Sequence, residues 1–192
     1  LKMIKKNFKF LLCFLILLAL PIRLIALDDS DIFLNSVFFS AVKKSNYDKV
    51  QKMIEEGISL NINDFEGLTP LAYALKNDDE KMFDILISKG ADINKKILEG
   101  NSHLIFYISN KRSKLIEKII NSDANLNFQD RIGRNALMNA IERKNLNAIN
   151  ILIEKNFDKE VTDYSGKTIL DYANRTRDEN IKKLVNRRYF GE

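Results

Sequence analysis

Glycine recurs in this sequence at a fixed interval, and that interval limits the folds that the chain can adopt. The recurring glycines, each 33 residues after the last, are Gly67, Gly100, Gly133 and Gly166. The position four residues after each glycine is leucine, at Leu71, Leu104, Leu137 and Leu170. A period of this length, sustained over about 150 residues, predicts an array of stacked units, each of which buries its apolar face against its neighbours.

Three further columns keep the same phase. The position seven after the glycine, with its counterpart one period upstream, holds Ala41, Ala74, Tyr107, Ala140 and Ala173. An aliphatic pair near the end of each unit recurs as Met53-Ile54, Leu86-Ile87, Ile119-Ile120 and Leu152-Ile153. An asparagine column contains Asn61, Asn94 and Asn127, and Glu160 departs from it. Many columns in one phase indicate repeats more strongly than any single motif does.

Local signals predict two short helices in each unit. The second residue after each glycine is an N-cap type, namely Thr69, Ser102, Asn135 and Thr168. In the unit that begins at residue 64, the spacing predicts a first helix over 70–76, which the polar pair Asn77-Asp78 ends. A second helix then presents Met82, Phe83, Leu86 and Ile87 on one face. Gly90 supplies the left-handed residue that stops it.

The stretch from Asp64 to Leu71, together with Gly90 to Asn94, resembles the signature of an ankyrin repeat. The likeness covers roughly residues 35–186. It implies an all-α, ankyrin-type repeat solenoid of about five helix-turn-helix units with a 33-residue period. We expect a repeat domain over 27–192, with an N-terminal cap unit at 27–63, repeats at 64–96, 97–129 and 130–162, and a C-terminal cap unit at 163–192. Residues 179–188, with few apolar groups, suit the polar outer face of a terminal unit.

The sequence departs from the family's pattern in ways that affect stability. The position after the first-helix leucine is often a histidine that bonds to the capping threonine, and here it holds Ala72, Ile105, Met138 and Asp171. In the unit 97–129, His103 replaces the proline and Asp123 replaces the left-handed glycine. Loss of these features predicts central units that are less stable than an idealised array.

Residues 1–26 have the pattern of a secretory signal peptide. Four lysines precede an apolar run from Phe10 to Leu20, which is too short to span a bilayer, and a short tail ends at Ala26. We expect cleavage after Ala26, with Ala19 as the weaker site. The alternatives are an uncleaved anchor, a lipid on Cys13, and a buried core helix, against which Arg23 argues.

Residues 1–26 bear on both the expected location of the protein and the net charge of the cleaved chain. Export places the protein in the periplasm of a Gram-negative-type bacterium and otherwise outside the cell. All five charged side chains of residues 1–26 are basic, so the chain from Leu27 onward has 26 basic and 26 acidic groups. This balance predicts neither a nucleic-acid partner nor binding to an anionic membrane, and we expect no membrane span in the mature chain.

No pattern in the sequence points to catalysis. The one histidine, His103, lies in the first turn of an expected helix, where we interpret it as a surface or capping residue, and the cleaved chain would have no cysteine. Asp64, Asp130 and Asp163 recur three residues before a glycine, where they would order the turn. We therefore predict no enzyme, no cofactor and no metal site.

The family resemblance implies that a protein partner binds the tips of the turns and the concave face of the first helices. Carried over to this chain, the partner-binding residues are Phe65, Glu66, Leu68, Leu98, Arg131, Ile132, Arg134 and Tyr164. Aromatic, arginine and aliphatic side chains at exposed tips are typical of an interface core. Alternatively, Phe65 and Leu98 fold back onto the neighbouring turn. We predict a monomeric, non-catalytic interaction module, and the alternative function is an envelope accessory or chaperone-like protein that binds several clients weakly.

Overall fold

A computed structural model describes residues 29–155, 157–158 and 160–190. The predicted signal peptide lies outside the described residues. By their contacts, residues 35–192 form one compact unit. Residues 29–34, which form the start of helix α2, are not part of that unit.

The described residues form α-helices and one 3-10 helix, with no strand. The helices are α2 (Asp29–Lys43), α3 (Tyr47–Glu55), α4 (Pro70–Lys76), α5 (Glu80–Ser88), α6 (His103–Ser109), α7 (Ile116–Asn121), α8 (Ala136–Glu142), α9 (Leu146–Ile153), α10 (Ile169–Arg175) and α11 (Glu179–Phe190), and the 3-10 helix is η1 (Leu98–Gly100).

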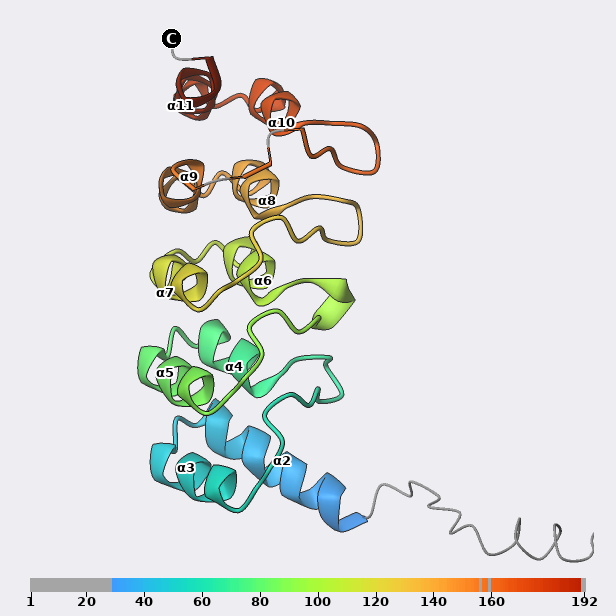
Figure 1. The fold of residues 1–192 in the computed structure, drawn as a ribbon, viewed down its shortest axis with the longest axis vertical. Coiled ribbons are helices and arrows are strands. Elements are labelled where there is room, and N and C mark those ends of the chain that lie inside the picture. The colour runs from blue at the N-terminus through green and yellow to red at the C-terminus, as the bar shows by residue number, and fades with distance from the viewer. Residues whose placement is uncertain (1–28, 156, 159, 191–192) are drawn as a thin grey trace, which may run out of the picture. The chain divides into compact units, whose positions relative to one another are not determined.

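Within residues 35–192 the helices form stacked antiparallel pairs. Each first helix contacts the next first helix, in the order α4, α6, α8 and α10, and each also contacts the second helix of its own pair. Figure 1 shows the extended turns between successive pairs projecting from one side of the stack. The prediction of an all-α repeat solenoid is confirmed.

The predicted N-caps start the first helices. The cap side chains accept hydrogen bonds from the third amide that follows, at Thr69, Ser102, Asn135 and Thr168, over donor–acceptor distances of 3.1, 3.2, 2.9 and 3.2 Å. Each bond satisfies an amide that has no partner inside its helix. This local chemistry explains why α4, α6, α8 and α10 each begin three residues after the glycine.

A left-handed residue separates the two helices of each of the first four units. These residues are Ser45, Asp78, Lys111 and Lys144, with φ between 52° and 58°. They recur at the 33-residue step, but none of them is glycine, so no glycine marks these positions in the sequence. Asp123, with φ of 62°, likewise keeps the left-handed conformation that Gly90 adopts at φ of 95°. The replacement of glycine by Asp123 thus leaves the turn in place, and the left-handed conformation costs about 1 kcal/mol there.

The asparagine column joins each unit to the next. Asn61 Oδ1 accepts from the Asp92 amide at 2.8 Å, and Asn94 Oδ1 accepts from the Asn125 amide at 2.8 Å. Asn127 Oδ1 makes the same bond to the Asp158 amide at 3.3 Å. The column therefore forms a ladder that runs along the array, which accounts for its 33-residue period.

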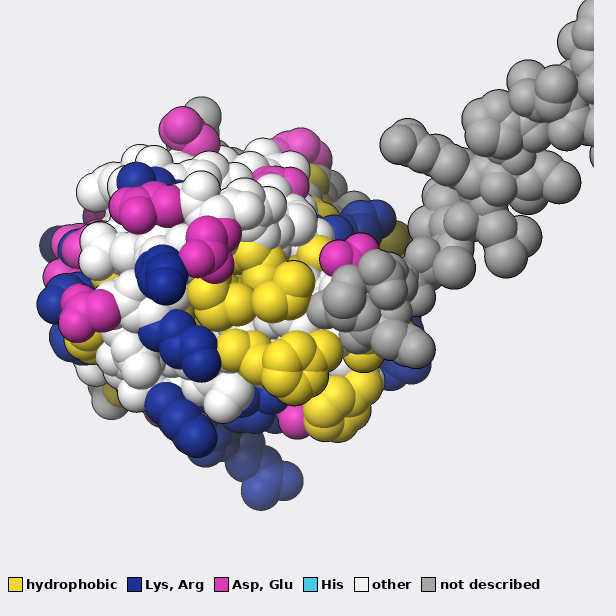
Figure 2. Space-filling model, turned by 90° about the horizontal axis from the view of Figure 1, so that it is seen from below, with side chains coloured by type: hydrophobic (Ala, Val, Ile, Leu, Met, Phe, Trp, Pro, Cys, Tyr) yellow, Lys and Arg dark blue, Asp and Glu magenta, His cyan; other side chains and the backbone are white. Residues whose placement is uncertain are grey.

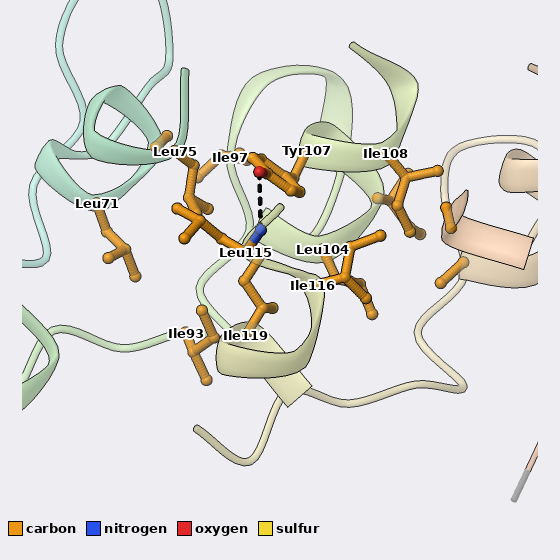
Figure 3. Close-up of a cluster of buried hydrophobic side chains, with 14 of the residues drawn as sticks. Leu71, Leu75, Ile93, Ile97, Leu104, Tyr107, Ile108, Leu115, Ile116 and Ile119 are labelled. Atoms are coloured by element: carbon orange, nitrogen blue, oxygen red, sulfur yellow. Dashed lines mark hydrogen bonds between the residues drawn. The ribbon is translucent and has the colours of Figure 1, made fainter. Parts of the chain in front are cut away.

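Tyr107 stands in the alanine column and has a structural role there. Its fully buried hydroxyl accepts from the Leu115 amide at 2.9 Å and donates to Asp78 Oδ1 at 2.6 Å. The first of these bonds is drawn in Figure 3, among the side chains of the core. Leu115 precedes α7, which has no side-chain cap of its own. Tyr107 thus anchors the residue just before α7 and also connects two units.

The two ends of the stack differ in polarity. Figure 2, a view from below onto the end where α2 and α3 lie in Figure 1, shows hydrophobic side chains gathered in one area. The last helix, α11, instead exposes Lys183, Arg187 and Arg188. Among the described residues, no helix combines the length and apolar character needed to cross a bilayer.

Candidate partner-binding surface

An aspartate organises the base of the turns 64–68, 130–134 and 163–167, as predicted. Asp163 Oδ1 accepts hydrogen bonds from the amides of Ser165 and Lys167 at 2.8 and 2.9 Å. Asp64 and Asp130 make the equivalent bonds to the amides two and four residues after them, at 3.0 to 3.2 Å. The turn closes around the carboxylate, so these aspartates hold the tips in position and are not themselves available to a metal or partner.

The second carboxylate oxygen binds a side chain of the first helix. Tyr73 and Tyr172 donate their hydroxyls to Asp64 Oδ2 and Asp163 Oδ2, each at 2.7 Å. In the unit 130–162, Asn139 Nδ2 donates to Asp130 Oδ2 at 3.0 Å in place of the phenol. In the unit 97–129 the aspartate position holds Ile97 and the tyrosine position holds Phe106. These apolar side chains need no such bond.

These hydrogen bonds affect the acidity of the aspartates. Burial by itself would raise the pKa of Asp163, but the bonds from Lys167, Tyr172 and Ser165 together outweigh it and hold the pKa well below its usual range. The pKa values of Asp64 and Asp130 are lowered by the same balance. All three turns therefore keep a charged, hydrogen-bonded carboxylate at neutral pH.

Most of the predicted partner-binding residues are exposed at the turn tips. The exposed fraction of the residue is 93% for Phe65, 72% for Tyr164, 46% for Ile132 and 41% for Leu98. Arg131 and Glu66 are exposed, and Arg134 is partly buried, with its Nε 2.9 Å from Asp130 Oδ2. We call this set the tip surface: Phe65, Glu66, Leu98, Arg131, Ile132, Arg134 and Tyr164.

One predicted member does not belong to this surface. Leu68 is only 2% exposed and lies in the hydrophobic core. Its amide bonds to Asp64, and the turn therefore directs the residue inward at the start of the unit. The expectation that Leu68 is exposed was wrong, because position in the loop alone does not reveal the direction of a side chain.

The aromatic tip at Phe65 does not fold back into the core. Its ring contacts solvent on nearly all sides, and Lys43 Nζ lies 5.9 Å from the ring centroid. Leu98 approaches the neighbouring turn more closely, because its amide donates to the Gly67 carbonyl at 2.9 Å. Folding back onto the neighbouring turn was the alternative expectation for both Phe65 and Leu98. Only Leu98 makes a backbone hydrogen bond to that turn.

The turns are linked in two pairs. The Leu98 amide joins the turn 97–101 to the turn 64–68, and the Tyr164 amide joins 163–167 to 130–134 through the Ile132 carbonyl at 3.0 Å. Gln129 Nε2 reinforces the second pair by donating to the carbonyls of Gly133 and Thr162. No backbone bond joins 97–101 to 130–134 within the described part of the chain. The tip surface thus has an N-terminal and a C-terminal half.

An open hollow of about 420 Å³ lies at the C-terminal pair of turns. Its lining includes four members of the tip surface: Arg131, Ile132, Arg134 and Tyr164. Lys167 lines it as well, and α10 adds Tyr172 and Arg175. No sequence pattern predicted Arg175 as a site residue. Its counterpart 33 residues earlier, Glu142, lies at the end of the preceding first helix and lines the same hollow.

The prediction that His103 is a surface residue was wrong. His103 is fully buried, with Nδ1 2.9 Å from the Ile93 carbonyl and Nε2 2.7 Å from Thr69 Oγ1. Because the carbonyl can only accept, Nδ1 carries the proton and Nε2 accepts from the threonine hydroxyl. The bond from histidine to capping threonine, expected to be lost, is therefore made from a position two residues before the usual one. It joins two units and leaves His103 inaccessible to a substrate.

Burial makes the stability of the array depend on this histidine's protonation. Burial lowers the pKa of His103 to about 4 against an ordinary value of 6.5, although the Ile93 carbonyl and Asp92 oppose the shift. The unfolded chain therefore takes up a proton before the folded one does as the pH falls. We expect about 3 kcal/mol of the free energy of unfolding to be lost between about pH 6.5 and pH 4, as measured by urea unfolding at several pH values.

The control for this pH dependence is His103→Gln, which has no titrating group. Its stability should vary less over the same interval, because the turn aspartates, with lowered pKa values, lose their contribution mainly below about pH 4. If wild type and variant lose the same free energy between about pH 6.5 and pH 4, the buried neutral histidine is not the cause.

The described residues contain no group of three or more His, Cys, Asp or Glu side chains placed to hold a metal ion. A family model, that of ankyrin repeats in three copies, matches residues 6–97 and 104–190. The first match begins within the predicted signal segment. No curated protein matches the chain.

Proposed function

The chain belongs to the ankyrin repeat family, and from that premise we propose that it binds a protein partner through its tip surface. Members of this family are generally protein-protein interaction modules and are typically not enzymes. The observation that most supports this binding mode is the 93% exposure of Phe65 at a turn fixed by hydrogen bonds. Because the backbone of this turn is held, an aromatic side chain with only two side-chain torsions loses little conformational entropy when a partner covers it.

Photo-crosslinking in the native host tests this proposal. A benzophenone amino acid at position 65 should capture one defined partner, which mass spectrometry then identifies. The same amino acid at Lys183, which is exposed on α11, is the matched control and should not capture that partner. Equal capture from both positions would contradict binding through the tip surface.

A second candidate function uses the same surface differently. The exposed apolar tips, such as Ile132 at 46% and Tyr164 at 72%, also suit weak binding of several clients by an envelope accessory or chaperone-like protein. A pull-down separates the two functions: one partner at stoichiometric yield supports the interaction module, and many substoichiometric clients support the accessory protein.

Replacing Phe65 by Ala should weaken binding of the identified partner by about 2 kcal/mol or more, the scale of an interface hot spot. Tyr164→Ala should do the same, since its backbone bond to Ile132 stays in place. The free energy of unfolding should change by about 0.5 kcal/mol or less in Phe65→Ala, because the ring buries almost no area. Isothermal titration and thermal melts measure both quantities. A fall in melting temperature as large as that of a core variant would show that the tip is packed structure.

The proposal also places the protein outside the cytoplasm, in the periplasm or in the medium. Its support is the sequence pattern of residues 1–26, with basic residues, an apolar run and a small residue at Ala26. Mass spectrometry of the protein from its native host should find Leu27 at the N-terminus. An N-terminus at residue 1 or 3 would reject cleavage.

A further inference from the structure

The basic side chains in and beside the two halves of the tip surface differ in whether they form ion pairs. In the N-terminal half the lysines already have carboxylate partners: Lys43 Nζ lies 3.2 Å from Asp64 Oδ2, and Lys76 Nζ lies 3.8 Å from Glu66 Oε2. At the C-terminal half, neither Arg131 nor the neighbouring Arg175 forms an ion pair among the described residues, whereas Arg134 pairs with Asp130. This difference indicates that the two halves recognise different chemistry.

Cations dominate the hollow between the turns 130–134 and 163–167. Of the six charged side chains that line it, Arg131, Arg134, Lys167 and Arg175 are basic, and only Glu142 and Asp163 are acidic. Asp163 is 5% exposed and is fully engaged by the turn and by Tyr172, so it contributes little to recognition. Arg134 is partly neutralised by Asp130. Three cations and one exposed carboxylate therefore face an incoming group.

Those three cations have little to bind within the protein. Lys167 Nζ makes a hydrogen bond to the Ser165 hydroxyl at 2.8 Å and no ion pair among the described residues. Arg131 and Arg175 are exposed. Like charges close to one another repel, and an anion placed between them would remove that repulsion and would accept charge-assisted hydrogen bonds.

The walls of the hollow also offer apolar area on a rigid frame. Tyr164 and Ile132 are 72% and 46% exposed, and the backbone bond between them fixes their spacing. Gln129 Nε2 also joins the two turns, because it donates to the Gly133 carbonyl at 2.6 Å and to the Thr162 carbonyl at 2.9 Å. A ligand that enters need not order the turns, so the entropic cost of binding is small.

We propose that this hollow binds an acidic peptide segment of the partner, in which an Asp or Glu carboxylate lies among Arg131, Lys167 and Arg175 and an adjacent apolar side chain lies against Tyr164 and Ile132. This inference rests on the proposed function and names the chemistry that one half of the tip surface recognises. A volume of about 420 Å³ accommodates a few amino-acid side chains.

A peptide fits the site better than a polyanion does. The chain from Leu27 onward is balanced in charge, so a nucleic acid or an anionic bilayer would meet as many carboxylates as cations beyond the hollow. Glu142, exposed at the edge, would repel a densely charged ligand and tolerate one or two separate carboxylates. The combination of local cations with apolar neighbours is therefore suited to an acidic and partly apolar segment.

An array of short synthetic peptides of random sequence, probed with the full chain, tests the proposal. The bound peptides should be enriched in Asp or Glu next to an aromatic or aliphatic residue. Changing those acids to Asn or Gln should weaken the best binder by about 10-fold or more, and the affinity of the acidic peptide should fall as NaCl rises from about 0.05 to about 0.5 M.

Matched double variants locate the binding site. Arg131→Gln with Arg175→Gln removes two exposed cations of the hollow and should weaken the best acidic peptide by about 10-fold or more. Arg177→Gln with Arg187→Gln removes the same charge from exposed positions that do not line the hollow, and it should change the affinity by about twofold or less. Both double variants should keep the wild-type melting temperature within a few degrees, which thermal melts check.

The possible failures are distinguishable. Peptide binding without a preference for acids, or unchanged in the Arg131→Gln, Arg175→Gln variant, overturns the acidic-peptide site, while the proposed function stands if cross-linking from position 65 still captures a partner. An array without any bound peptide also overturns the site. Displacement of the acidic peptide by duplex DNA or by phosphatidylglycerol vesicles at lower concentration would show a general anion site and would equally overturn the proposal.

Discussion

Replacing Gly133 by Ala should lower the free energy of unfolding by about 3 kcal/mol or more. Gly133 has a φ of +88°, and the left-handed conformation alone costs a residue with a Cβ about 1 to 2 kcal/mol. An added Cβ would also lie 2.5 Å from the Tyr164 nitrogen and 2.6 Å from Tyr164 Cδ1, so the next turn would have to move. Overpacking of this kind adds about 1 to 3 kcal/mol. Urea unfolding followed by circular dichroism measures the loss.

Gly166→Ala is the matched control. Gly166 has a similar φ of +82°, but a Cβ there would meet no atom within 4 Å. Its cost should be limited to the backbone term of about 1 to 2 kcal/mol. The difference between the variants isolates the contact between the turns 130–134 and 163–167. If the two variants are equally destabilised, that contact is looser than its distances indicate.

Leu86→Ala should cost about 2 to 5 kcal/mol of the free energy of unfolding, through lost transfer energy and the cavity left behind. Leu86 is fully buried on α5, and Leu152 has the same column and burial on α9, so Leu152→Ala should behave alike. Binding of a partner should be lost in these variants only to the extent that folding is lost. Thermal melts and titrations on the same samples measure the two effects.

Leu146→Ala provides the same chemical change at a residue that is 39% exposed. Its cost should be about 1 kcal/mol or less, because no closed cavity forms. A cost equal to that of Leu86→Ala would mean that the second helices are packed differently from the arrangement described here.

The sequence was sufficient to predict the fold because the repeat appears in many columns at once. The N-caps at Thr69 and Thr168 and the turn aspartates act within a few residues of their partners, so their roles can be read locally. The left-handed residues at Ser45, Lys111 and Lys144 could not be predicted, because stacking of the helices imposes that conformation on residue types that do not favour it.

The candidate site was only partly predictable. Exposure at the tips followed from the resemblance, but Leu68 shares a loop with Phe65 and points into the core. The role of His103 depends on Thr69 and Ile93, which lie 34 and 10 residues away, and no local pattern reports such distances. The hollow around Arg131 and Arg175 likewise arises from residues of two units that the stack brings together.

The asparagine ladder gives the array a direction in which it can grow. Asn61, Asn94 and Asn127 each accept a hydrogen bond from the unit that follows. Duplication of an internal unit would carry its own asparagine and insert without a break in the ladder. Lengthening of the array by internal duplication is therefore compatible with these contacts.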